Sequence, residues 1–234
     1  MREIVAGSPM DWQLDRLDRQ LALTAVKRME AGTTVPPVRG FVRSEFNPLI
    51  YHAGRAAFAQ AELAASGIPP ERRGVLLGSL FGDAVTEQES WRDLLAGRKI
   101  SPIMFPQSVP SAIVGYLARD LEIRGPMSCI GTASMGAYSM LLQAADWLIE
   151  DDADAVLLLF CDVPSHRAEH WAKLHAEEGG FAGGAVAAIV ERNSEARERG
   201  AADAMPIRQF HDRMAGSSVN RYGMAGIPEG GNRE

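Results

Sequence analysis

The stretch that decides the fold is Gly125-Pro-Met-Ser-Cys-Ile-Gly-Thr-Ala-Ser134-Met-Gly-Ala137. Its apolar part, Met127 to Thr132, is typical of a strand, and a helix with an apolar stripe follows Ser134. A strand that turns sharply into a helix places one side chain beside unpaired N–H groups and the positive end of the helix dipole. We expect that side chain to be Ser134. The position favours a thiolate, but a serine hydroxyl needs an adjacent general base before it attacks.

Outward from this stretch, strand-like and helix-like segments alternate along the chain. The stretch Ala155 to Phe160 is apolar on both faces, which is typical of a central strand covered on both sides. We expect helices of this chain to cover one of those faces. The alternation predicts an α/β fold with a mixed sheet. We expect helices at 11–31, 55–66, 108–121, 134–149 and 193–199, and strands at 74–78, 127–132, 155–160 and 185–190.

Composition and charge narrow the class of protein. The chain has 234 residues, 46% of them apolar and 23% charged, which predicts a single domain over 1–234, with a polar tail at about 226–234. The net charge is -6 without a basic stripe, so nucleic acid is not an expected partner. The apolar run Ala155 to Cys161 is far shorter than the roughly 20 residues of a membrane span, and no signal core opens the chain. We therefore expect a cytoplasmic protein, with Cys129 and Cys161 both buried.

Several motifs in order resemble β-ketoacyl synthases of the thiolase-like family. Gly125-Pro126 and Thr132-Ala133 are in register with that family's Gly-Pro, five residues, then Thr-Ala-Cys. The resemblance extends over roughly 55–202. It also includes Ser101-Pro-x-x-Phe-Pro106, Ala153-Asp154-Ala155, Phe181-Ala-Gly-Gly184 and the charged segment Glu195 to Ala201. It implies the N-terminal half of an αβαβα layered sandwich, a half that would leave a sheet face or a helix layer exposed without a partner.

The departures from the family pattern shape the functional expectation. Ser134 stands where the family keeps its nucleophilic cysteine, and the sequence lacks the second half in which the family keeps two histidines. The pattern is similar to short chain-length-factor subunits of aryl-polyene and type II polyketide ketosynthases. It implies a non-condensing subunit, inactive alone and without a cofactor, that forms a heterodimer with a full-length ketosynthase and meets acyl carrier protein through that complex.

The same resemblance implies an interface and an acyl tunnel. In thiolase-like dimers the strand before the nucleophile pairs across the interface, and it corresponds here to Met127, Ser128, Cys129, Ile130, Gly131 and Thr132. The helix that opens at Ser108 would line the tunnel, with Phe105, Val109, Ile113 and Tyr116 as candidates for setting the chain length. The alternative for these four residues is an ordinary place in the core.

Two other chemistries stay open at the level of the sequence. His166-Arg-Ala-Glu-His170 fits the H-x-x-E-H pattern of inverted zinc proteases, although such a site needs a third ligand downstream, and an exposed helix is the alternative. Ser134 could instead act as the nucleophile of an acyltransferase or thioesterase, with His166, His170 or His175 as base. Its surroundings miss the G-x-S-x-G pattern by one residue.

Glycines 74, 78 and 82 precede Asp83 but match no phosphate-binding loop, so no nucleotide is expected there. We expect Gly78 and Gly82 to allow a tight turn after a strand.

Overall fold

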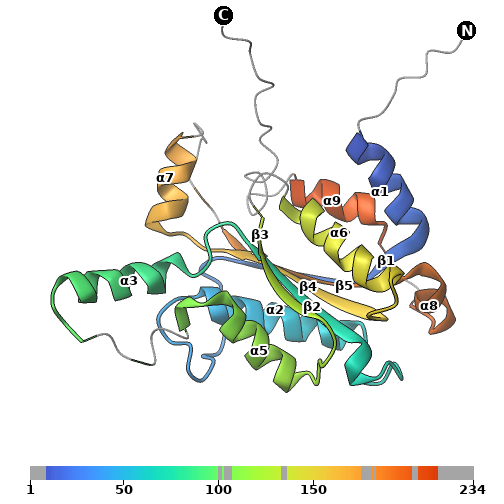
Figure 1. Cartoon of the computed structure of the whole chain (residues 1–234), viewed down its shortest axis with the longest axis horizontal. Helices are drawn as coiled ribbons and strands as arrows, with labels where there is room; N and C mark the ends of the chain where they lie inside the picture. The colour runs from blue at the N-terminus through green and yellow to red at the C-terminus, as the bar shows by residue number, and fades with distance from the viewer. Residues whose placement is uncertain are drawn as a thin grey trace, which may run out of the picture.

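The computed structural model describes residues 9–99, 102, 107–132, 136–174, 181, 183–201 and 205–215. These residues form an α/β fold with helices on both sides of one sheet (Figure 1). The elements are α1 (Pro9–Gln20), β1 (Leu21–Glu30), α2 (Phe46–Gln60), the short 3-10 helix η1 (Pro70–Arg72), β2 (Arg73–Ser79), α3 (Ala84–Leu95), α5 (Pro110–Asp120), β3 (Met127–Gly131), α6 (Gly136–Ile149), β4 (Ala155–Asp162), α7 (His166–Leu174), β5 (Gly184–Arg192), α8 (Asn193–Glu198) and α9 (Ile207–Ala215).

The five strands form one mixed sheet in the order β1-β5-β4-β2-β3. Strands β4, β2 and β3 run parallel, whereas β5 is antiparallel to both of its neighbours. The mixed sheet expected from the sequence is therefore confirmed, and β1 and β3 are its two edges.

The central strand β4 explains how the core is divided. Every residue of β4 is buried, as expected for a strand covered on both sides. One apolar cluster contains residues of α2 and α5, and the other contains residues of α1, α6 and α9. Figure 1 shows the two helix layers below and above the sheet. We expected helices of this chain over one sheet face, and the described helices cover both faces, because α1 and α9 pack beside α6 on the second face.

The first predicted element is also wrong in part. The segment 11–31 is not one helix, because α1 ends at Gln20 and β1 follows at once. Leu21 and Ala25 have the spacing of a helix, but Leu21, Leu23 and Ala25 also alternate as in a strand, so periodicity alone does not separate the two. Hydrogen bonding to β5 makes this segment a strand, and the strand has a β-bulge between Leu23 and Ala25.

The other expected strands and most expected helices are present within a few residues. Helix α2 begins nine residues before and ends six residues before the expected segment 55–66. Helices α3 and α9 were not expected. In the part of the chain that the structure describes, no helix has the length and apolar character that crossing a membrane requires.

Contacts from α8 and from Met205 cover the β1 edge. Leu23 and Met205 exchange backbone hydrogen bonds of 3.1 and 2.8 Å. Arg199, just after α8, donates hydrogen bonds of 2.6 and 2.5 Å to the fully buried carboxylate of Glu191 in β5. The hydroxyl of Thr24 in β1 also donates to this carboxylate. Because a buried carboxylate needs charged or hydrogen-bonding partners, this cluster ties β1 and β5 to α8.

Candidate partner interface

Strand β3 pairs with β2, and no other strand of the described sheet pairs with its outer side. At one end Val75 N donates to Pro126 O at 2.9 Å, and at the other Thr132 N donates to Ser79 O at 3.1 Å. In a parallel pair, the residues of one strand that bond to the neighbour alternate with residues that bond outward. The backbone N–H and C=O groups of the even-numbered residues of β3 therefore point toward β2.

The odd-numbered residues of β3 accordingly present their backbone groups to the open edge. Met127 is 53% exposed, Cys129 and Gly131 are also exposed, and Ile130 packs against the cluster around α6. Strand β3 carries no charged side chain. An uncharged edge strand is a ready template for pairing with another chain.

The prediction that both cysteines are buried is wrong for Cys129, because β3 is an edge strand. Cys161 in β4 is buried, as expected, and burial raises the pKa of its thiol well above the usual range. Cys129 is exposed. Both segments are apolar in sequence, but Cys129 lies on an edge strand and Cys161 lies on a central one.

The predicted strand-to-helix turn is partly described. Ser134 lies outside the described residues, as do Ala133 and Met135. Helix α6 begins at Gly136, which has a φ of 47° and whose N–H donates to Thr132 O at 2.7 Å. A strand and a helix therefore flank Ser134 as expected, and the catalytic reading of Ser134 stays a prediction.

Glycine 78 allows this turn to approach the sheet. A Cβ atom at Gly78 would lie 2.2 Å from Met140 Sδ and 2.6 Å from Thr132 Cγ2. The expectation of a turn at Gly78 is wrong, since Gly78 lies within β2 and its small size serves close packing. Gly82 does occupy a turn, with a φ of 62°.

Three of the four residues predicted to line an acyl tunnel are described, and they differ in burial. Phe105 lies outside the described residues, and Val109 is the residue before α5. Ile113 is fully buried in the core. The ring of Tyr116 makes edge-to-face contacts with those of Phe41 and Tyr51, with both centroid distances at 5.7 Å. Ile113 and Tyr116 thus make core contacts, and a tunnel role for the four residues stays a prediction.

A buried carboxylate at the end of β4 holds the loop that follows β2. Ser79 Oγ donates to Asp162 Oδ1 at 2.7 Å, and the N–H groups of Leu80 and Phe81 donate to the same carboxylate at 2.9 to 3.1 Å. The N–H of Gly82 donates to Ser79 Oγ at 2.8 Å. Burial raises the pKa of Asp162 to about 6, and the three donors oppose that rise. We refer to Ser79 and Asp162 with these backbone donors as the Asp162 cluster.

A second buried carboxylate anchors the start of α3. Asp83 caps the helix by accepting from Thr86 N at 3.1 Å and Thr86 Oγ1 at 2.9 Å. Asn47 Nδ2 in α2 donates to Asp83 at 2.9 Å and to Gln107 O at 3.1 Å. Burial raises the pKa of Asp83, while these hydrogen bonds lower it in part.

Sequence reasoning missed both carboxylate clusters. One signal was available, because Asp162 is a charged residue at the end of an otherwise apolar strand. The carboxyl ends of the parallel strands β2 and β4 lie at the same edge of the sheet, so Asp162 and Ser79 were candidates for a contact.

The histidine pair of the zinc alternative lies on the exposed side of α7. The rings of His166 and His170 are nearly parallel, with centroids 6.5 Å apart. Among the described residues, no group of three or more His, Cys, Asp or Glu side chains is placed to hold a metal ion. His175 and the carboxylates at 177 and 178 lie outside them.

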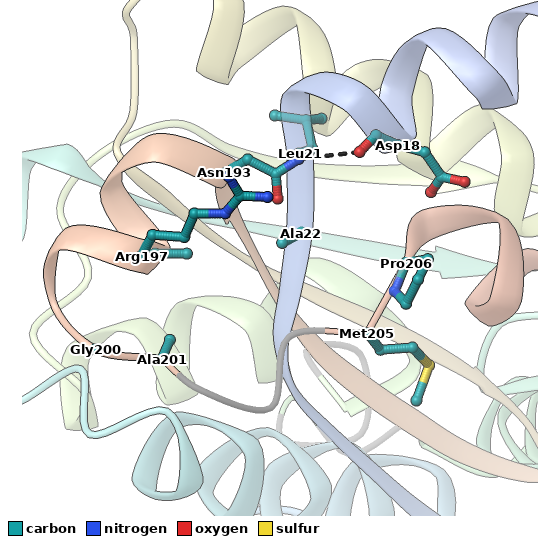
Figure 2. Close-up of a pocket in the computed structure, with 10 residues that line it drawn as sticks. Asp18, Leu21, Ala22, Asn193, Arg197, Gly200, Ala201, Met205 and Pro206 are labelled. Atoms are coloured by element: carbon teal, nitrogen blue, oxygen red, sulfur yellow. Dashed lines mark hydrogen bonds between the residues drawn. The ribbon is translucent and has the colours of Figure 1, made fainter.

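The pocket in Figure 2 belongs to the opposite edge of the sheet. It has a volume of about 460 Å³ and lies between the α1–β1 junction and α8. Asn193 Nδ2 donates to Asp18 O at 2.9 Å across one side of it. Met205, which bonds to β1, also lines the pocket, so the pocket is part of the cover over the β1 edge.

Comparison with solved structures places the fold. The chain is similar to a chain of the AntDE:AntF structure, a type II polyketide synthase acyl-carrier protein in complex with its ketosynthase, with 16% identity over 78% of this chain and 66% of that chain, and a TM-score of 0.61. It is also similar to the ishigamide ketosynthase/chain length factor, with 17% identity over 78% of this chain and 60% of that one, and a TM-score of 0.58. It is similar as well to a chain of the complex of ketosynthase ApeO with its chain length factor ApeC from Xenorhabdus doucetiae. The identity is 18% over 69% of this chain and 63% of that one, and the TM-score is 0.50.

These likenesses define a thiolase-like α/β fold, as expected from the resemblance in sequence. The chain spans 60 to 66% of the length of those three solved chains. The family profile described as "Beta-ketoacyl synthase, N-terminal domain" matches residues 52–220, which is more than half of the chain. The chain belongs to this family.

Proposed function

We propose that this chain is a non-condensing, chain-length-factor-like partner of an active ketosynthase. The two would form a heterodimer in the cytoplasm that elongates an acyl chain on acyl carrier protein, in type II polyketide, aryl-polyene or fatty-acid-like synthesis. The observation that carries the proposal is the open, uncharged edge of β3, the strand that leads to Ser134.

The residue at position 134 supports the non-condensing part of the proposal. Claisen condensation by this family uses a cysteine thiolate at that position, and a serine hydroxyl is a weak nucleophile without a paired base. Strand β3 supports the partner part, because its outward N–H and C=O groups lack strand partners within the described sheet.

Co-expression tests the partner proposal. The tagged chain is expressed with each full-length ketosynthase of its own genome, one at a time, and purified complexes are weighed by native mass spectrometry. We expect a stable one-to-one complex with one of them, and the same complex when the tag is moved to the ketosynthase. A chain that is stable alone and co-purifies with none of them contradicts the proposal.

Intact mass tests the inactivity of Ser134. The chain is incubated with acyl-carrier-protein thioesters, alone and in its complex. We expect no acyl adduct on this chain. An adduct that forms on the wild type and is lost in Ser134→Ala, while Ser139→Ala keeps it, would instead support a serine acyltransferase or thioesterase.

A further inference from the structure

Helix α3 carries an exposed apolar stripe. Trp91 is 55% exposed, Leu94 47% and Leu95 84%. Their spacing of three and four residues puts them on one face of the helix. Among the residues that the structure describes, the other large exposed apolar side chains lie singly on five different segments: Trp12, Val42, Met127, Ile149 and Leu174. Single exposed apolar residues are normal, whereas a cluster marks an interaction surface.

The helix is held firmly at its start and extends away from the sheet at its end. Asp83 caps it, and Arg167 of α7 makes two hydrogen bonds of 2.8 and 2.9 Å to Glu87. In the helix itself, the buried residues are Ala84 and Thr86, both in its first turn. Figure 1 shows α3 projecting beyond the end of the sheet. The apolar stripe therefore lies on a helix whose direction is fixed by contacts elsewhere.

The start of α3 is linked to strand β3 through helix α5. A Cβ atom at Gly82, just before α3, would lie 3.5 Å from Pro110 Cγ at the start of α5. Helix α5 contacts β3. Strand β3, α5 and the start of α3 are thus neighbours in the fold, and the apolar stripe lies in the second half of α3, beyond that start.

The β3 edge is too small to hold a partner alone. Its five residues span roughly 17 Å at the usual rise per residue. A stable interface buries roughly 800 Å² on each partner and uses about 20 to 30 residues a side. The partner must therefore contact flanking surfaces, and buried aromatic and aliphatic anchors are the contacts that contribute most to affinity.

We infer that α3 is a second docking element for the ketosynthase that pairs with β3, and that Trp91, Leu94 and Leu95 insert into an apolar groove of that partner. The spacing of these residues is that of helices bound in grooves. The inference rests on the proposed function, since it names a further contact of the same partner.

The test measures affinity in the complex obtained by co-expression. Trp91→Ala combined with Leu95→Ala is expected to weaken the binding of the same ketosynthase by about 30-fold or more, as for hot-spot anchors. The melting temperature of the free chain should not change. The matched control is Trp12→Ala on α1, a tryptophan that is 61% exposed, which should leave affinity unchanged.

Each other outcome overturns the inference. Unchanged affinity in the double variant removes α3 from the interface. A lower melting temperature of the free double variant means that a segment of this chain covers the stripe. A free wild-type dimer that becomes monomeric in the double variant means that a second copy covers it.

The experiment also separates this inference from the function on which it rests. Without any wild-type complex, both fall together. With a wild-type complex that Cys129→Pro disrupts and the α3 variant does not, the partner function stands and only the role of α3 is rejected.

Discussion

The two edges of the sheet differ in how they are protected. Strand β1 has ten residues, carries Lys27, Arg28 and Glu30, and bonds to Met205. Strand β3 has five residues, no charged side chain and, in the part of the sheet that the structure describes, no strand on its outer side. Charged side chains and covering segments are the usual means of keeping an edge strand from pairing with other chains. The difference teaches that, within the described residues, this chain covers the β1 edge and pairs no strand with the outer side of β3, which supports the proposal that β3 receives the partner.

The largest expected effect lies at the closed edge. Arg199→Met leaves the buried carboxylate of Glu191 without its cation, and breaking a buried ion pair from one side costs about 3 to 5 kcal/mol. Chemical denaturation of the free chain measures this loss. Arg55→Met, which removes an exposed pair with Asp120, is the control and should cost less than about 1 kcal/mol. Equal losses in both variants would mean that the Glu191 cluster does not stabilise this edge.

The next effect lies at the open edge. Cys129 presents its N–H outward, so Cys129→Pro should keep the bonds to β2 and remove a donor that a partner strand needs. We expect the ketosynthase complex to weaken by about 100-fold, from lost hydrogen bonds and the clash of the proline ring. Titration of the partner measures it, and circular dichroism checks the fold.

The matched control for that variant is on β1. Ala31 N donates to Gly183 O at 3.5 Å, so by alternation along the antiparallel pair the N–H of Arg28 points away from β5. Arg28→Pro should therefore leave the complex intact. If Arg28→Pro weakens the ketosynthase complex and Cys129→Pro does not, the partner binds at the β1 edge, which contradicts the proposal.

The sequence predicted those elements that a local pattern determines, and it failed where a contact between distant segments determines the element. The apolar strand β4 and the strand-to-helix segments beside Ser134 follow from local pattern. Strand β1 does not, because Leu21, Leu23 and Ala25 fit two periods until β5 pairs with them. The exposure of Cys129 depends on its place in the strand order, which no local pattern encodes.

The candidate site was predicted to a similar degree. The resemblance in sequence predicted an interface strand at 127–132, and β3 lies at an edge of the described sheet, while its role as an interface stays a prediction. The Asp162 cluster did not follow, since it joins residues 79 and 162 that are far apart in sequence. Ser134 and Phe105 lie outside the described residues.

The Asp162 cluster, which joins β2 and β4, gives an effect of similar size that depends on pH. Burial raises the pKa of Asp162 from 3.8 to about 6. The folded state therefore holds this proton more tightly than the unfolded state does. Its contribution to stability is fully present below pH 3.8 and is lost as the pH rises through about 6.

A shift of this size corresponds to about 3 kcal/mol, at roughly 1.4 kcal/mol for each pKa unit. Denaturation curves of wild type and Asp162→Asn at several pH values measure it. We expect the wild type to lose stability relative to the variant as the pH rises from about 4 to 7. A difference that stays constant over that range contradicts the raised pKa.

The smallest effect compares Gly78 in β2 with Gly131 in β3. Gly78→Ala forces a Cβ against Met140 and Thr132 and should cost about 1 to 3 kcal/mol. Gly131→Ala meets no atom within 4 Å and should leave the stability of the free chain within about 0.5 kcal/mol. Thermal unfolding measures both, and a larger loss for Gly131→Ala would mean that another segment of the free chain packs against the sheet face at Gly131.

Backbone hydrogen exchange tests the account most directly, because it reads the amides of both edges in the free chain and in the ketosynthase complex. We predict that the amides of Met127, Cys129 and Gly131 exchange rapidly in the free chain and slow by about 100-fold in the complex. The outward amide of Arg28 on β1 should exchange at the same rate in both. A complex that forms without slowing the β3 amides, or that slows the β1 amide instead, would contradict the claim that β3 is the strand that receives the partner.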